Sequence, residues 1–457
     1  MEESSSSLPR NTPRIPQELI DIAIDLLHDD HTTLKSCSLI CSSTLHICRK
    51  FLFRRIIIDI FDLPTKLGAS QLDRFAQFWG QSPHLVQYVE EFHIKYIPQS
   101  ILPNLFGALE PFRDQKLKRF SLEAPTGFMN PGLNGSLESL LNCSMGELTH
   151  LRLGDITEVP RNLFGRFEKL RTLVVGSHVA VVPIPPPEDI DDSQIDHEDD
   201  GDHDGTDEQP EDSLAVNEIP IDDAGDTDAP DDDTIGFTKP PLEGLHLLSD
   251  IPDDTLNFLA GPDSGLDLTK LRRLTSMANT SFRADLSSRY VLFHKAAATL
   301  EFLAYEPSIL GLHLAQPSIL DLRTMPNLRH FVPYIQQYNG DVNFVPWLND
   351  HFSALPPVNS LLEITIVVTF LNAPMMDMVE GQGWHRLDEI LAGFENLQRC
   401  RFICFGHDFG QVESMLQRSM VRLKEKGILG IRKTSAASVY PNDNSFEHFE
   451  LDRDWWP

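Results

Sequence analysis

A stretch near the middle of the chain has the residue types and spacing of a calcium-binding loop. Residues 200–211 (DGDHDGTDEQPE) match the template in which carboxylates at alternating positions and a final Glu surround Ca²⁺. The surrounding sequence is strongly acidic, and prolines flank the match at Pro187 and Pro220, where an EF-hand requires helices. We therefore expect diffuse cation binding at most, and no bound metal ion or other cofactor.

The other short motifs lack the residues that would complete a reactive site. Asp408-Phe409-Gly410 spells the kinase magnesium motif, but no glycine-rich phosphate loop, strand lysine or His-Arg-Asp loop accompanies it. Cys37 and Cys41, like Cys400 and Cys404, have no two further ligands at zinc spacing. We predict a non-catalytic protein with small buried thiols and no metal site. A hydrolase with a dispersed His and Asp site is an alternative.

The sequence contains an internal repeat, which predicts its strands and helices. The pattern apolar-x-x-apolar-x-apolar, complete or in part, occurs ten times, beginning at Val89, Leu117, Leu148, Leu170, Leu242, Leu271, Leu300, Leu328, Leu361 and Leu397. Successive copies are 22 to 36 residues apart, except for one step of 72 residues that contains the 46 residues 188–233. Removing these leaves a step of 26, so we interpret 188–233 as an insertion between two neighbouring repeats.

Each copy predicts a short strand, followed by a turn and a helix that returns the chain to the next strand. Helical patterns at 287–298, 345–355 and 384–393 lie just before strand candidates. The repeats resemble leucine-rich repeats, although Asn279 is the only copy of their usual asparagine. The resemblance implies an irregular arc of strands and helices. A compact α/β domain with coincidental spacing is the alternative.

Acidic charge is concentrated in the insertion. The chain has 38 Lys and Arg against 68 Asp and Glu, a net charge of −30, and residues 188–233 hold 22 of the acidic residues and no Lys or Arg. The rest of the chain therefore carries 38 − 46 = −8. We expect a disordered insertion, no nucleic-acid or membrane partner, and a protein target that could be basic. The absence of an apolar run of about 18 residues and of a leader pattern predicts an intracellular protein, cytoplasmic or nuclear.

Three short helices and a strand are predicted in the first sixty residues. Five apolar residues between Leu19 and Leu27 share one face of a helix over Gln17–His28. A second helix carries Leu34, Cys37 and Cys41 on one stripe, and a third, about 45–53, leads into a strand at Ile56–Ile60. Helices this short bury little surface, so an apolar face left over would need a partner.

These first sixty residues resemble an F-box in the form common in mushroom-type fungi. The matching segments are 15–20 (IPQELI), 34–41 (LKSCSLIC) and 49–53 (RKFLF), and Thr44 stands where that family usually has a tryptophan. Segments 359–366 and 384–405 also resemble those fungal proteins. The resemblance implies an α/β fold class, with an N-terminal three-helix F-box followed by an irregular leucine-rich-repeat-like solenoid with a disordered acidic insertion.

The function that this resemblance implies is substrate recognition in a Skp/cullin/F-box ubiquitin ligase. The helices would bind the Skp adaptor, and through it the cullin scaffold, while the repeats hold a protein target for degradation. The expected adaptor contacts, some of which could instead only pack the helices together, are Pro16, Leu19, Ile20, Ile24, Leu39 and Leu52. An interaction scaffold that keeps the box but has no ligase role is the alternative.

The expected organisation has six parts. Residues 1–12 form a disordered N-terminus, 13–60 the F-box, 61–187 the first part of the repeats, 188–233 the insertion, 234–435 the second part of the repeats and 436–457 a C-terminal tail.

Overall fold

The computed structural model describes most of the predicted box and repeats. The described residues are 15–59, 65–95, 105, 109–112, 115–123, 141, 146–154, 156, 159–176, 179–182, 239–248, 251–277, 286–307, 320–337, 344–370, 383–406 and 409–433. The insertion 188–233 with its calcium-loop pattern, Asn279, Asp408, residues 1–12 and the tail 436–457 lie outside them.

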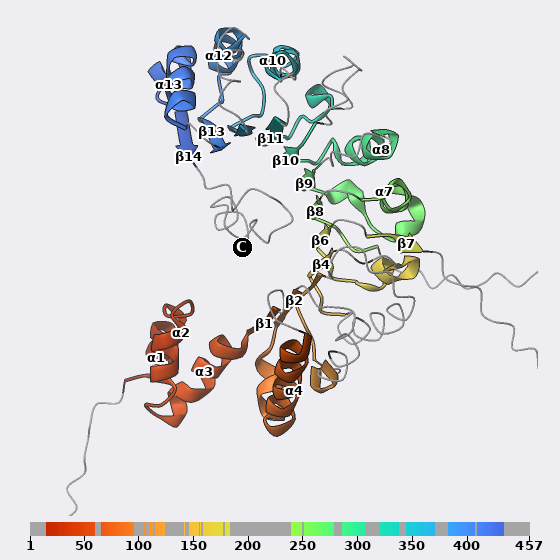
Figure 1. Ribbon diagram of the computed structural model, residues 1–457, viewed down its shortest axis with the longest axis vertical. Coiled ribbons are helices and arrows are strands. Elements are labelled where there is room, and N and C mark those ends of the chain that lie inside the picture. The colour runs from red at the N-terminus through yellow and green to blue at the C-terminus, as the bar shows by residue number, and fades with distance from the viewer. Residues whose placement is uncertain are drawn as a thin grey trace, which may run out of the picture. The chain divides into compact units, whose positions relative to one another are not determined.

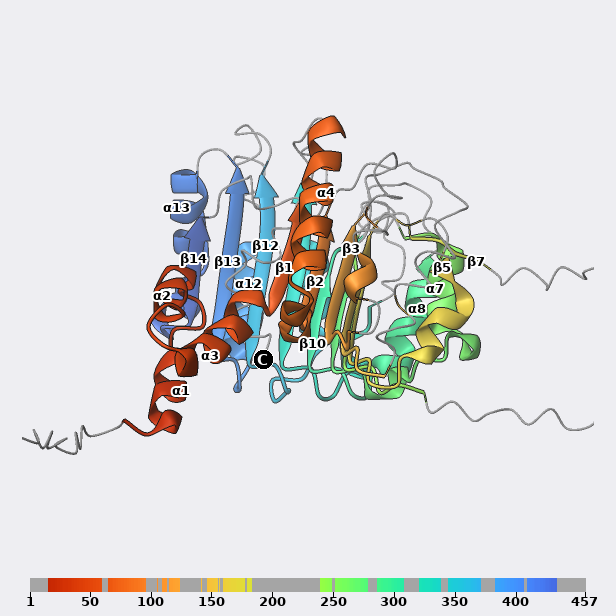
Figure 2. The ribbon, with the colours of Figure 1, turned by 90° about the horizontal axis from the view of Figure 1, so that it is seen from below.

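Twelve of the described strands form one open parallel sheet that follows the order of the sequence (Figure 1), and Figure 2 shows the strands of this sheet as arrows seen from the side. Its strands are β1 (Arg55–Asp59), β2 (Glu91–Lys95), β3 (Arg119–Glu123), β4 (His150–Gly154), β6 (Thr172–Val175), β8 (Gly244–Leu247), β9 (Arg273–Ser276), β10 (Phe302–Tyr305), β11 (His330–Gln337), β12 (Glu363–Phe370), β13 (Arg399–Gly406) and β14 (Leu429–Lys433). The two-residue strands β5 (Val159–Pro160) and β7 (Val181–Val182) pair with each other in a separate, parallel sheet. The α/β class and all ten strands predicted from the repeat are confirmed, as is the strand that follows the third helix.

The helices that connect the strands lie on one face of the sheet (Figure 1). The described α-helices are α1 (Gln17–Asp25), α2 (His31–Cys37), α3 (Ser42–Phe53), α4 (Thr65–Gln81), α7 (Asp253–Ala260), α8 (Leu286–Ala296), α10 (Val345–Ser353), α12 (Trp384–Gly393), α13 (Phe409–Ser419) and α14 (Val421–Glu425). In the described residues between β4 and β6 the 3-10 helix Arg161–Arg166 takes the place of an α-helix, whereas the 3-10 helix Pro83–Tyr88 follows α4 in the same connection. Helices α8, α10 and α12 confirm the three helical patterns predicted before strands.

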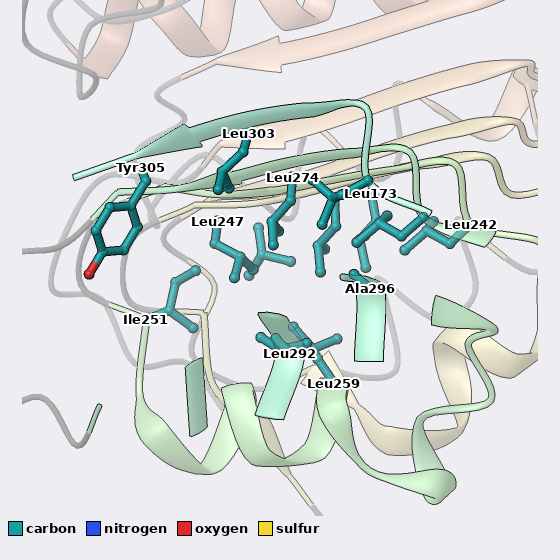
Figure 3. Close-up of a cluster of buried hydrophobic side chains, with 14 of the residues drawn as sticks. Leu173, Leu242, Leu247, Ile251, Leu259, Leu274, Leu292, Ala296, Leu303 and Tyr305 are labelled. Atoms are coloured by element: carbon teal, nitrogen blue, oxygen red, sulfur yellow. The ribbon is translucent and has the colours of Figure 1, made fainter. Parts of the chain in front are cut away.

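The main core lies between the sheet and these helices because every second strand residue points toward them. Leu173, Leu245, Leu274 and Leu303 are direct neighbours on adjacent strands, and each is at most 1% exposed. Figure 3 shows three of these leucines facing side chains of α7 and α8, among them Leu259 and Leu292. A repeat that is apolar at alternate strand positions thus builds a continuous leucine layer.

Polar side chains at the turns before the strands connect neighbouring units. The side chain donates a hydrogen bond to a backbone carbonyl of the preceding unit in the pairs Gln115 to Val89, Thr149 to Lys118, Thr299 to Leu271, Asn327 to Ala298, Ser360 to Leu328 and Asn396 to Asn359, over 2.5–2.9 Å. A mixed set of Gln, Thr, Asn and Ser therefore satisfies turn carbonyls in this part of the chain. In the parts of the chain that the structure describes, no helix combines the length and apolar character that crossing a bilayer requires.

Candidate functional site

The three N-terminal helices form a small core of their own. Ile24 of α1, Leu34 of α2 and Cys48 of α3 are at most 4% exposed and pack together. Ile20 and Leu52 are half-buried against this cluster. Of the predicted adaptor contacts, Ile24 is thus placed inside the helix bundle, because the face of α1 that carries it is the face that α3 covers. Its role is packing.

A second apolar stripe of α1 points away from that core. At 100° per residue, Leu19, Ile22 and Leu26 fall within about 60° of one another, well apart from the direction of Ile24, and Ile15 lies just before the helix. These four side chains are 56–80% exposed, and in the turn between α2 and α3 Leu39 and Ile40 are 86% and 72% exposed. They are six of the twelve large exposed apolar side chains among the described residues. We call these six residues the apolar stripe.

The apolar stripe contains only two of the predicted adaptor contacts, Leu19 and Leu39. Pro16 is exposed next to it, and its carbonyl accepts the first helical bond of α1, from the Leu19 amide at 3.1 Å. Sequence reasoning missed Ile22 and Leu26 because it followed a single stripe of α1. The signal in the sequence was that apolar residues occupy two different faces of this helix, and a small bundle covers only one of them.

Thr44 packs inside the helix bundle. Its side chain is 6% exposed, and its hydroxyl lies 2.9 Å from both the Cys37 and the Cys41 carbonyl oxygens. The hydroxyl donates its single proton to this pair of carbonyls, where the turn from α2 leads into α3. Thr44 therefore stabilises the turn that presents Leu39 and Ile40.

Cys41 contradicts the prediction that all the cysteines are buried. It is exposed at the N-cap of α3, and hydrogen bonding, chiefly with the Ser43 hydroxyl, lowers the pKa of its thiol to about 7. Cys400 and Cys404 are buried as predicted, and burial raises the pKa of each to about 12. Among the residues that the structure describes, no group of three or more His, Cys, Asp or Glu side chains is placed to hold a metal ion.

A second candidate surface is the sheet face opposite the connecting helices. The strand register shows which residues of each strand from β1 to β13 lie on this face. We consider the first two such residues of each strand. The charged residues at these positions are Arg55, Glu91, Arg119, Arg152, Arg273, Glu363, Arg399 and Arg401. Six cations against two anions give +4 on the described part of this surface, in a chain whose net charge is −30. We call these eight residues the arginine face.

At one end of the arginine face, several cations surround Glu91 on β2. The Nη2 atom of Arg54 lies 3.3 Å from its carboxylate, and the Nε atoms of Arg55 and Arg119 each lie 3.9 Å away. His93 is 4.0 Å away. Burial acts to raise the pKa of Glu91, but His93 and the arginines outweigh it, so the pKa lies below its usual value. Glu91 is ionised, and its single charge faces three guanidinium groups.

Glu363 on β12 has the same kind of surroundings toward the other end of the sheet. Arg401 donates a hydrogen bond to its carboxylate, the Nη1 atom of Arg399 lies 3.8 Å from it, and the Nδ1 atom of His330 lies 3.7 Å from it. The Glu363 side chain is 9% exposed, whereas that of Arg399 is 64% exposed. The Glu363 carboxylate is buried between these side chains, while the Arg399 side chain extends into solvent.

Three histidines of the same face add no positive charge near neutral pH. Burial first, and neighbouring arginines second, lower the pKa values of His150, His246 and His330 to about 4. The Nδ1 atom of His246 is 2.9 Å from the Thr275 hydroxyl on the next strand. These rings serve as neutral hydrogen-bonding spacers, and the arginines supply the charge.

Further along the strands, the same face becomes apolar. Met277, Ala304, Val332, Tyr334, Val367, Ile403 and Phe405 pack together and are at most 8% exposed. Glu306, directly after β10, is 5% exposed, and burial raises its pKa to about 8, an effect that Arg289 partly opposes. A carboxyl group that is mostly protonated near pH 7 thus lies beyond the carboxyl end of a strand.

The two surfaces differ in the chemistry they offer. The apolar stripe can bury aliphatic side chains of a partner, and the arginine face can bind carboxylate or phosphate groups. Comparison with known proteins adds no further assignment, because neither the protein-family models nor the curated proteins gave a match to this sequence.

Proposed function

We propose that this chain is the target-recognition subunit of a Skp/cullin/F-box ubiquitin ligase. Residues 13–60 would act as the F-box that binds the Skp adaptor, which links the chain to the cullin scaffold. The parallel sheet would act as an irregular leucine-rich-repeat-like solenoid that holds a protein target. The chain itself performs no chemistry in this proposal.

The observation that carries the proposal is the apolar stripe. Half of the large exposed apolar side chains in the described residues lie between Ile15 and Ile40. Burying one Leu or Ile side chain contributes about 1.5–3 kcal/mol, so six of them form a strong anchor for a partner. This exposure is costly in water without a partner, and it occurs on a helix bundle that already has its own core.

The open sheet supports the second half of the proposal. Parallel strands in sequence order present alternate side chains on the face opposite the connecting helices, where a partner can contact several repeats at once. The described part of that face carries charged and polar side chains at the start of the strands, as a binding surface requires.

The test is co-purification of the full chain with the Skp adaptor. We expect the wild-type chain to form a stable complex and the double variant Leu19→Asp/Leu39→Asp to lose it, because two charges enter the centre of the apolar contact. Both residues are exposed, so the variant keeps its thermal stability. Val358→Asp is the matched control, since Val358 is 62% exposed but lies far along the chain, before β12.

Two results would contradict the proposal. A wild-type chain that does not bind the adaptor would favour the scaffold without a ligase role. A double variant that binds as well as the wild type would show that the apolar stripe is not the contact surface.

A further inference from the structure

We propose that the arginine face binds an extended, Asp/Glu-rich segment of the target protein, with its centre at Arg399 and Arg401 on β13. This inference rests on the proposed function, because it names the class of target that the sheet would hold. The net charge of the chain favours a basic target, and the distribution of charge in the structure favours the opposite.

The first argument is the local charge. The eight residues of the arginine face carry +4, and including the third same-face residue of each strand adds Asp59, Lys95, Glu123 and Glu306 and leaves the described face positive at +2. Even that count treats Glu306 as ionised, although its pKa is raised to about 8. The field at this face therefore attracts anions in a chain that repels them elsewhere.

The second argument is geometry. Arg399 and Arg401 are two residues apart on one strand, and both side chains leave the same face of the sheet. Residues two apart on a strand are about 6.6–7 Å apart, which is also the spacing of alternate side chains in an extended peptide. Carboxylates at alternate positions of a bound segment would therefore match this pair of guanidinium groups.

The third argument is that these arginines are held in place yet reachable. Arg401 is fixed by its hydrogen bond to the buried Glu363, and its side chain is 26% exposed. Arg399 is 64% exposed and keeps its Nη1 atom 3.8 Å from the same carboxylate. A partly immobilised guanidinium loses less side-chain entropy when it forms a bidentate pair with a carboxylate.

Several cations outside the face lie in direct contact with a carboxylate. Just before the strands, Arg272 is 2.6 Å from Glu301, and Lys118 is 3.0 Å from Glu90. On the helix-covered side, Arg422 of α14 is 2.6 Å from Glu389. Arg272 and Arg422 each contact a carboxylate at 2.6 Å, whereas Arg399 and Arg401 share Glu363.

The experiment measures binding of a fluorescein-labelled peptide of alternating Glu and Gly residues to the full chain by fluorescence anisotropy. We expect binding that weakens as salt rises, and a loss of about tenfold in affinity for Arg399→Ala, the equivalent of one charge-assisted contact. Glu363 keeps Arg401 and His330 in this variant, so the fold is retained. Arg422→Ala removes the same charge from an arginine that is 57% exposed on α14, and should leave binding unchanged.

Comparison peptides identify the class of target. A Lys-Gly peptide that binds more tightly than the Glu-Gly peptide would overturn the proposal in favour of a basic target. Binding of only a phosphoserine-Gly peptide, or of only a single-stranded RNA, would overturn it in favour of those ligands. Equal binding by Arg399→Ala and wild type would also overturn it. Binding seen only after residues 188–233 are deleted would make the chain's own acidic stretch the occupant instead of a target.

Adaptor capture separates this inference from the proposed function. Arg399→Ala should still bind the Skp adaptor, and Leu19→Asp/Leu39→Asp should still bind the peptide. Adaptor binding without peptide binding would remove the inference alone, and peptide binding without adaptor binding would remove the ligase role alone.

Discussion

Glu306 gives the sharpest prediction for the stability of the sheet. Its side chain is 5% exposed, and its backbone amide donates to the Ser276 carbonyl at 3.0 Å, which fixes it beside the end of β9. Burial raises its pKa from 4.5 to about 8, and Arg289 opposes this only in part. Replacing it with Gln keeps the size of the side chain and removes the titration.

The sign of the pH effect follows from the proton that the folded state retains. Because the folded pKa is the higher one, the contribution of Glu306 to stability is complete below pH 4.5 and is lost as pH rises through 8. At about 1.36 kcal/mol per pKa unit, the loss reaches about 3 kcal/mol at pH 7 and about 5 kcal/mol above pH 8. Glu306→Gln should therefore gain stability over the wild type by about these amounts, and most at high pH.

The assay is urea unfolding followed by circular dichroism at pH 5, 7 and 9. The difference in unfolding free energy between Glu306→Gln and wild type should increase with pH, by about 4 kcal/mol across this range. Glu168→Gln removes an exposed carboxylate and serves as the control for the loss of a Glu side chain. A Glu306→Gln difference that does not change with pH, or a variant less stable than wild type at pH 9, would refute the reasoning.

Two further predictions concern single side chains. Asp388 is 3% exposed and accepts hydrogen bonds from the Arg422 and Leu423 amides at 2.8 and 3.0 Å, so Asp388→Ala should cost about 2 kcal/mol of unfolding free energy by leaving these amides unpaired. Retention of wild-type stability in urea unfolding would contradict this role as a helix cap. Cys41 should react with iodoacetamide at pH 7 well before Cys400, because its thiol is exposed and its pKa is lowered to about 7. Peptide mapping by mass spectrometry checks the order, and Ser43→Ala should slow Cys41 by removing its largest stabilising hydrogen bond.

The strands could be predicted because their signal is local. A residue such as Leu245 must be apolar to face the helices, and the apolar positions recur at every unit, so the repeat marks each strand independently. Helix α7 was not predicted, because its buried residues occupy two turns and leave little periodicity. The 3-10 helices were not predicted, for the same reason.

The apolar stripe could be predicted only in part. Leu19 and Leu39 came from the resemblance to a known motif, whereas Ile24 was assigned to the same surface although it packs inside. Sequence periodicity finds apolar faces but does not say which of two faces the rest of the bundle covers. That choice depends on where α3 crosses α1, which is a tertiary property.

The arginine face escaped prediction for a physical reason. Its residues come from seven strands that are spread over the sequence, and each is followed by an apolar residue that faces the other way. The net charge of the chain combines these arginines with the 22 acidic residues of the stretch 188–233, so the total is negative. Only the register, in which Glu363 pairs with Arg399 and His330, brings the cations together. The charge of one surface of a repeat protein can therefore be opposite in sign to the net charge of the chain. The reason is that each stacked repeat adds one residue to the same row of side chains across the strands.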